Sequence, residues 1–134
     1  MTQEVLGLAK KELESKIQRR AQKIITDNGG FVIKTHGDQY SRPGIPDLIC
    51  CIPSNLETIE RLQEKNLINK DKIGIFVAFE MKQLDKLKET SKAQFIVGKE
   101  ITNAGGIWDN CDDTEQIEFM IKLIKGELCY TKNM

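Results

Sequence analysis

Three charged residues interrupt segments that are otherwise apolar. Asp47 follows Pro46 at the start of LICCI, and Glu80 and Lys82 stand two positions apart in FVAFEMK. Residues two apart in an extended strand point to the same face, so Glu80 and Lys82 are expected to project together. Two charges on one face of an apolar strand are costly to bury without partners, which indicates that they have a chemical role.

A divalent metal ion would suit these carboxylates. Mg²⁺ takes oxygen ligands and is commonly held by one or two carboxylates together with waters and phosphate oxygens. We expect Asp47 and Glu80 to bind Mg²⁺ or Mn²⁺, with the backbone carbonyl of Met81 as a further ligand. Such an ion activates a water and offsets charge on a phosphodiester, while Lys82 can orient that water and stabilise the phosphoryl oxygens. The residue types therefore indicate metal-dependent phosphodiester hydrolysis.

A helix is predicted over about residues 4–27, ended by Asn28-Gly29-Gly30. Its apolar residues recur at helical spacing and should pack on a sheet; they are Leu13, Ile17, Ala21, Ile24 and Ile25. Glu14 falls within this apolar stripe at about 100° per residue. It either has a role there or is a boundary residue that reaches solvent.

Strands are predicted at FVIKT, IPDLICCI, IGIFVAFEMK and GIWD. These β-branched and apolar segments alternate with helical ones, and the segment 37–46 has the residues of a loop. Residues 53–72 are predicted to be an inserted helix with its connections, and a C-terminal helix should begin at Asp113-Thr114 and end at Gly126. The order predicts an α/β protein with a central mixed sheet flanked by helices, in one domain over residues 1–134.

Another helix is predicted from a Ser91 cap to Thr102. Helical spacing places Ala93, Val97 and Ile101 inward, with Gln94 beside Ala93. From there Gln94 can reach Lys82 or a phosphate. The alternative is a surface glutamine.

The segments Gly44-Ile45-Pro46-Asp47-Leu48-Ile49 and Phe79-Glu80-Met81-Lys82 resemble the PD-(D/E)xK nuclease superfamily, and within it the VRR-NUC domain, the virus-type replication and repair nuclease. Five elements occur in the order of that pattern, over roughly residues 12–110: Glu14 to Gln18, Gly44 to Leu48, Glu80 to Lys82, Gln94, and Gly105 or Gly106. The resemblance implies a restriction-endonuclease-like fold. It also implies an Mg²⁺-dependent endodeoxyribonuclease that acts on Holliday junctions, flaps or other branched DNA, or that nicks duplexes. Glu14 would be an outer metal ligand, and Gln94 would join the catalytic set of Asp47, Glu80 and Lys82.

The insertion at 53–72 departs from the family pattern, in which the spacing between the two motifs is usually shorter. Long insertions between paired strands cost little free energy. Leu56, Ile59 and Leu62 in this insertion are candidates for a homodimer contact. A small nuclease with one site must dimerise, or act twice, to cut both strands.

Seven residues are candidates for DNA contacts: Lys34, His36, Tyr40, Arg42, Lys86, Lys88 and Lys92. The basic ones can bind phosphate, and Tyr40 can stack on a base. For His36 the alternative is an ordinary polar loop residue, and for the lysine-rich stretch it is a solvated loop. With 20 basic and 20 acidic residues the net charge is zero, so DNA binding would need a local basic surface.

The four cysteines, at positions 50, 51, 111 and 129, form no CxxC pair and are expected to be buried thiols. The chain contains no long apolar run and no secretory signal at its start, so we expect a cytoplasmic protein, of a bacterium or a phage-infected cell. Two alternatives to the nuclease remain open. One is a catalytically inactive nuclease-like module that binds DNA or regulates, and the other is a structural α/β protein in which Glu80 and Lys82 form an ion pair.

Overall fold

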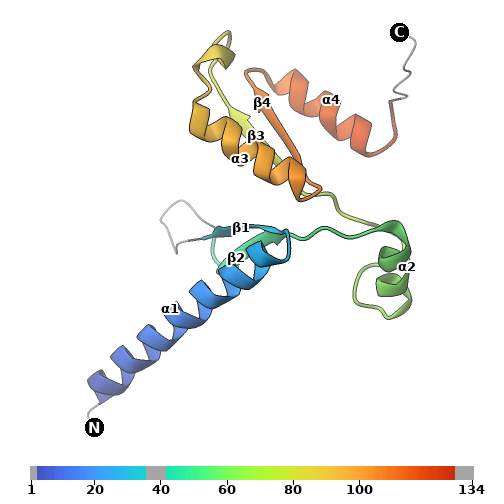
Figure 1. The fold of residues 1–134 in the computed structure, drawn as a ribbon. Helices are drawn as coiled ribbons and strands as arrows, with labels where there is room; N and C mark the ends of the chain where they lie inside the picture. The colour runs from blue at the N-terminus through green and yellow to red at the C-terminus, as the bar shows by residue number, and fades with distance from the viewer. Residues whose placement is uncertain (1–2, 36–41, 129–134) are drawn as a thin grey trace. The chain divides into compact units, whose positions relative to one another are not determined.

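The computed structural model describes residues 3–35 and 42–128. Within them the protein is mixed α/β, with four α-helices and two small two-stranded sheets, one antiparallel and one parallel (Figure 1). The chain divides into two compact units, Met1–Ser54 and Asn55–Met134. The mixed α/β class is confirmed, and the described strands form two sheets of two where the sequence predicted one central sheet.

The first unit contains helix α1 (Gln3–Asp27) and the strands β1 (Phe31–Lys34) and β2 (Leu48–Cys51). The two strands are antiparallel, with Ile33 opposite Ile49. After α1 the chain reverses through Gly29, whose φ of +80° favours glycine. The bounds of α1 and β1 agree closely with the sequence prediction, whereas β2 begins three residues after the start of the predicted IPDLICCI strand and Asp47 precedes it.

Helix α1 contacts both strands of this sheet, as its apolar stripe predicts. The contact is close at the C-terminal end of the helix, where a Cβ on Gly30 would lie 2.8 Å from Cγ2 of Ile25. Farther from that end the stripe is not covered, because Leu13 and Ile17 are 59% and 60% exposed. Ile24, in the last turn, is 56% exposed as well, so of the predicted stripe only Ala21 and Ile25 are partly buried.

The second unit begins with helix α2 (Leu56–Glu64), which lies in the 53–72 segment predicted to be a helical insertion. Asn55 caps it, with its side-chain oxygen accepting from the backbone N–H of Thr58 at 2.8 Å. An i,i+4 ion pair of Arg61 and Glu57, 2.6 Å apart, lies on the exposed surface of α2. Such a pair adds only a few tenths of a kcal/mol.

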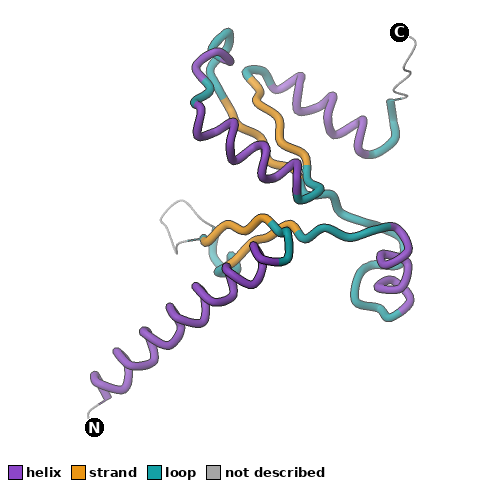
Figure 2. The backbone as a smooth tube through the Cα atoms, in the orientation of Figure 1, coloured by secondary structure: helices purple, strands orange, loops and turns teal. Residues whose placement is uncertain are grey.

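Strands β3 (Val77–Met81) and β4 (Ile107–Cys111) form the parallel sheet of the second unit (Figure 2). The sequence predicts a strand from Ile73, but β3 begins four residues later. The reason is the length of its neighbour: the N–H of Ile107 donates to the carbonyl of Phe76 at 2.9 Å, and β4 begins there. A strand extends only where a partner satisfies its backbone groups.

Helices α3 (Lys92–Asn103) and α4 (Thr114–Ile124) both contact β4. The indole of Trp108 sets the distance of α3 from the sheet, because a Cβ on Gly98 would lie 2.4 Å from its ring. Phe95 meets the same ring edge to face, with centroids 5.5 Å apart. Ile101 and Ala104 at the end of α3 are buried, and so is Cys111 at the end of β4.

No helix within residues 3–35 and 42–128 has both the length and the apolar character needed to cross a bilayer.

Candidate active site

Glu80 and Lys82 lie together at the end of β3. The N–H of Lys82 donates to the carbonyl of Cys111 at 2.8 Å, so Lys82 continues the strand geometry one residue beyond β3. Both side chains therefore lie on the face that α3 covers, as alternation predicts. Nζ of Lys82 is 3.4 Å from Oε1 of Glu80, and the side chains are only 17% and 30% exposed. The pair is largely shielded from water, where charge interactions are stronger than at an open surface.

Gln94 joins this pair from α3. Its Nε2 donates to Oε1 of Glu80 at 2.7 Å, and its Oε1 accepts from Nζ of Lys82 at 3.0 Å. One carboxamide therefore contacts both charged groups, with its nitrogen toward the carboxylate and its oxygen toward the ammonium. The structure places Gln94 within reach of Lys82, as the sequence analysis anticipated.

The inward face of α3 differs from the predicted one. Ala93 is exposed and Val97 is 41% exposed, so two of the three residues expected to point inward do not. Ile101 is buried as predicted, and Gln94 and Gly98 point inward in place of Ala93 and Val97. The close approach of Trp108 to Gly98 explains the rotation, because only a residue without a side chain fits beneath the indole.

A capping box fixes the orientation of the Gln94 carboxamide. The backbone N–H of Gln94 donates to Oγ of Ser91 at 3.1 Å, and the backbone N–H of Ser91 donates to Oε1 of Gln94 at 2.8 Å. Oε1 thus accepts from two donors, Ser91 and Lys82, which a nitrogen in that position could not do. The nitrogen of the amide is thereby directed to Glu80.

Asp47 belongs to the first unit, immediately before β2. Its side chain is exposed, and its carbonyl accepts from the N–H of Thr35 at 2.9 Å. The hydroxyl of Thr35 also donates to the carbonyl of Pro46. The backbone around Asp47 is therefore held to the end of β1, while its carboxylate remains accessible.

The other predicted residues are distributed over both units. Glu14 is exposed on α1, Lys34 is exposed at the end of β1, and Arg42 is exposed in the loop before β2. His36 and Tyr40 lie outside the described residues. Met81 ends β3, and its side chain is 48% exposed.

The lysine-rich segment leads from β3 to α3. Lys86 precedes the short 3₁₀ turn η1 (Leu87–Glu89), which contains Lys88, and Lys92 opens α3. All three lysines are exposed, and Lys86 lies 3.8 Å from the carboxylate of Glu89. A hydrogen bond of 2.9 Å from the N–H of Asp85 to Asp112 anchors the start of this segment beside β4. The segment is thus a basic, solvated loop held at its start.

Comparison of the chain with protein-family models, with curated proteins and with solved structures gives no match. The assignment of chemistry therefore depends on the residues themselves.

The oxygen atoms available here fit a hard divalent cation. The hydrogen bond and the ion pair that Glu80 makes both involve Oε1, which leaves Oε2 on the same carboxylate as a potential ligand. Within the described part of the chain, no three His, Cys, Asp or Glu side chains gather in a metal-binding group. An Mg²⁺ ion needs fewer, because waters complete its octahedral shell.

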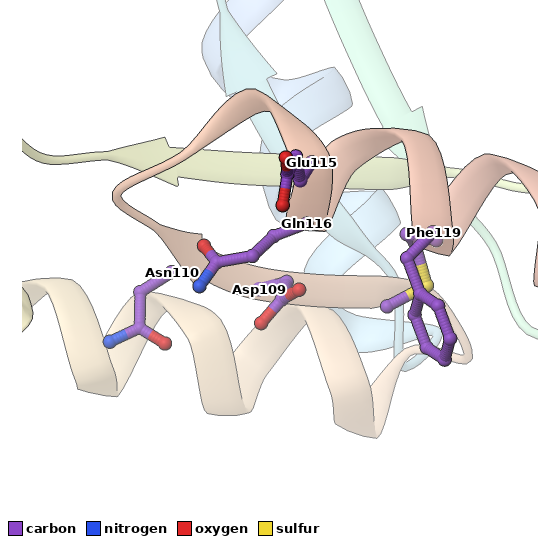
Figure 3. A pocket seen from close by; sticks show the side chains of 6 residues that line it. Asp109, Asn110, Glu115, Gln116 and Phe119 are labelled. Atoms are coloured by element: carbon purple, nitrogen blue, oxygen red, sulfur yellow. The ribbon is translucent and has the colours of Figure 1, made fainter. Parts of the chain in front are cut away.

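A separate hollow of about 370 Å³ lies between β4 and α4 (Figure 3). It is lined by Asp109, Asn110, Glu115, Gln116, Phe119 and Met120. In Figure 3 Asp109 lies between the amides of Asn110 and Gln116 and the ring of Phe119. The sequence analysis did not identify this hollow, since its residues come together only when α4 packs beside β4.

The cysteines Cys50, Cys51 and Cys111 are thiols, and Cys129 lies outside the described residues. Burial raises the pKa of Cys111 to about 11, and the charges of Asp109 and Asp112 act in the same direction. Burial and the neighbouring Cys50 also raise the pKa of Cys51. Cys111 is fully buried, as predicted, whereas Cys50 and Cys51 are only half-buried.

Two residues near the cluster were missed by the sequence analysis. Thr90 is the one buried polar residue in the part of the chain that the structure describes, and Asn110 donates to its hydroxyl oxygen at 3.3 Å. The Ser91-x-x-Gln94 spacing of a capping box can be seen in the sequence, and it indicates that Gln94 is tied to the helix start. Nothing in the sequence indicates that Asn110 meets Thr90.

Proposed function

We propose that this protein is a metal-dependent endonuclease that hydrolyses phosphodiester bonds in DNA. The observation that carries the proposal is the cluster of Glu80, Lys82 and Gln94, in which an acid and a base at the partly buried end of β3 are held together by an amide of α3. The resemblance of these motifs, with Gly44 to Ile49, to the VRR-NUC pattern supports the same chemistry.

Each residue has a distinct part in this proposal. Oε2 of Glu80 binds the cation, while Oε1 is engaged by Lys82 and Gln94. A bound Mg²⁺ or Mn²⁺ would activate water and offset phosphate charge. Lys82 orients the attacking water and interacts with the phosphoryl oxygens as their negative charge develops. Gln94 holds the side chains of Glu80 and Lys82 in fixed positions, which lowers the entropy cost of reaching a reactive geometry.

Asp47 supplies the second carboxylate. The proposal therefore includes a single restriction-endonuclease-like domain, in which both sheets belong to one central mixed sheet and Asp47 and Glu80 hold the same ion. Glu14 would act as an outer ligand from α1, and the carbonyl of Met81 as a further one.

Branched DNA, such as a flap or a Holliday junction, is the proposed substrate, and the resemblance alone supports that choice. The exposed lysines that precede and open α3 are suited to contact its phosphates, as are Lys34 and Arg42. A homodimer formed through the insertion would bring two sites to one branched substrate. Exposed Leu56, at 77%, is the strongest candidate in that surface.

The test combines cleavage with metal binding. Labelled linear duplex, flap and four-way junction DNA are incubated with the protein in Mg²⁺, Mn²⁺ or EDTA, and Mn²⁺ affinity is measured by calorimetry. Asp47→Ala and Glu80→Ala are expected to lose both cleavage and Mn²⁺ binding. Lys82→Ala is expected to lose cleavage and to retain Mn²⁺.

Glu100→Ala and Asp71→Ala are the matched controls, since both acids are exposed and outside the cluster. They should leave cleavage and Mn²⁺ affinity unchanged. Cleavage that persists in EDTA would exclude the mechanism. DNA binding without cleavage in any metal would instead favour a nuclease-like module that binds DNA or regulates.

A further inference from the structure

The buried hydroxyl of Thr90 both donates and accepts a hydrogen bond. Thr90 is 9% exposed, and its Oγ1 donates to the carbonyl of Leu87 at 2.7 Å and accepts from Nδ2 of Asn110 at 3.3 Å. A buried polar group that lacks partners costs about 1–3 kcal/mol. The two bonds therefore hold Thr90 in one place, between the end of η1 and β4.

Asn110 connects Thr90 to the candidate active site. In the register of the parallel sheet Asn110 is the direct neighbour of Glu80, so both side chains lie on the face that α3 covers. Thr90 is followed immediately by Ser91, which caps α3 and bonds Gln94. These contacts form a closed ring. Hydrogen bonds join Glu80 to Gln94 and Gln94 to Ser91, the backbone joins Ser91 to Thr90, and a hydrogen bond joins Thr90 to Asn110, which lies beside Glu80 in the sheet.

This ring restricts where the Gln94 amide meets the carboxylate of Glu80. The start of α3 is attached to β3 by Gln94 and to β4 by Thr90, so it cannot slide along the sheet without breaking one of these bonds. Gln94 consequently meets Oε1 of Glu80 at 2.7 Å. If the start of α3 were free, the amide could move away from the carboxylate, and the orientation of Glu80 would no longer be fixed.

We propose that Thr90 and Asn110 are positioning residues that hold Gln94 on one oxygen of Glu80 and so orient this carboxylate, with its other oxygen available for a divalent cation. The cation part rests on the proposed function, whereas the hold on Gln94 does not. Neither residue touches the cation in this proposal. Both act through the capping box, as groups outside a metal's own ligands commonly orient those ligands.

The test uses the full chain and two measurements. The first is NMR of the Gln94 side-chain amide, observed through its nuclear Overhauser contact with the methylene protons of Glu80. The second is Mn²⁺ affinity by calorimetry. Thr90→Val removes the hydroxyl and keeps the shape, Asn110→Ala removes its donor, and Thr90→Ser restores a hydroxyl.

Matched controls come from the other end of α3. Thr102→Val removes a hydroxyl that donates to the carbonyl of Gly98 at 3.0 Å, and Asn103→Ala removes an exposed amide of the same helix. Fluorescence of Trp108 reports whether each variant keeps the packing of α3 on the sheet.

In the wild type, Thr90→Ser and both controls, a strong Gln94–Glu80 contact is expected. In Thr90→Val and Asn110→Ala that contact should fall to half or less, and Mn²⁺ should bind about tenfold more weakly. An undiminished contact in Thr90→Val overturns the positioning role. A lost contact with unchanged Mn²⁺ affinity overturns its link to the cation.

Failure of the proposed function has a different signature. If the wild type binds no Mn²⁺, the nuclease proposal is refuted. The NMR measurement of the Gln94 amide then tests by itself whether Thr90 and Asn110 hold Gln94 in place. If Thr90→Val fails to fold, Thr90→Ser and Asn110→Ala carry the comparison.

Discussion

Replacing Gln94 by glutamate separates its two structural roles. Glutamate is as good as glutamine at this position of a capping box, so Gln94→Glu retains the acceptor for Ser91 and Lys82. It loses the donor to Glu80, because the atom now 2.7 Å from Oε1 would be an oxygen rather than a nitrogen. If helix capping dominated, the variant would be as stable as the wild type.

The magnitude follows from the contacts. Loss of a hydrogen bond to a charged acceptor costs about 1.5–3 kcal/mol. Two unit charges 4 Å apart repel by about 4 kcal/mol at an effective dielectric constant of 20, and attraction of the new carboxylate to Lys82 offsets much of this. We therefore expect Gln94→Glu to lower the free energy of unfolding by about 3 kcal/mol at pH 7, from the lost bond together with the remaining repulsion. Gln94→Ala loses the same bond to Glu80 and the side-chain acceptor of the capping box but introduces no charge, so it should lower the free energy of unfolding by about 2 kcal/mol.

Urea denaturation followed by tryptophan fluorescence measures this effect. Trp108 is the only tryptophan of the chain and packs on α3, so it reports on the second unit. Two carboxyl groups that share one proton do not repel, so the penalty in Gln94→Glu should shrink as the pH is lowered. Gln83→Glu, an exposed position, is the control for added charge. A Gln94→Glu protein more stable than Gln94→Ala at pH 7 would refute the reasoning.

Two further predictions concern the packing of the second unit. Gly98→Ala should lower the free energy of unfolding by about 1–3 kcal/mol, because the new Cβ meets Trp108. Gly74→Ala is the control, since the space around Gly74 is open and no loss is expected. Urea denaturation of the two variants measures the difference. Cys111 favours the fold while its thiol is protonated, and its pKa is raised from 9.0 to about 11. Stability should therefore be retained below pH 9 and fall as the pH rises toward 11, and this alkaline loss should be reduced in Cys111→Ala.

Local sequence signals predicted most of the individual elements. The Asn28-Gly29-Gly30 stop, the Ser91 cap and the Asp113 cap each agree with the ends of helices, because these residues act on their own backbone neighbourhood. The alternation in FVAFEMK placed Glu80 and Lys82 on one face for the same reason. The helix ends and the direction of these side chains depend on residues only a few positions apart, so they can be predicted from a short stretch of sequence.

Features that depend on distant residues were not predictable in the same way. The rotation of α3 is set by Trp108 against Gly98, ten positions away in the chain and on another element. The start of β3 is set by where β4 begins, and the bond of Asn110 to Thr90 exists only in this register. A helical wheel drawn from α3 alone predicts that Val97 faces the sheet, because Val97 has an apolar side chain and Gly98 has none. The wheel therefore does not indicate that Gly98 is the residue in contact with the sheet.

In the proposed nuclease site, charge balance is the reason for including Asp47 as a second carboxylate. Lys82 lies 3.4 Å from the carboxylate of Glu80 and neutralises it, so Glu80, Lys82 and Gln94 together have no net charge with which to attract a cation. A second carboxylate would give the site a net charge of minus one, and Asp47 is the acid that its position before an apolar strand indicates. The same balance explains why Lys82→Ala is expected to retain Mn²⁺: removal of the ammonium leaves Glu80 with an uncompensated charge. A loss of Mn²⁺ binding in that variant would mean that Lys82 holds Glu80 in place rather than acting on water and phosphate.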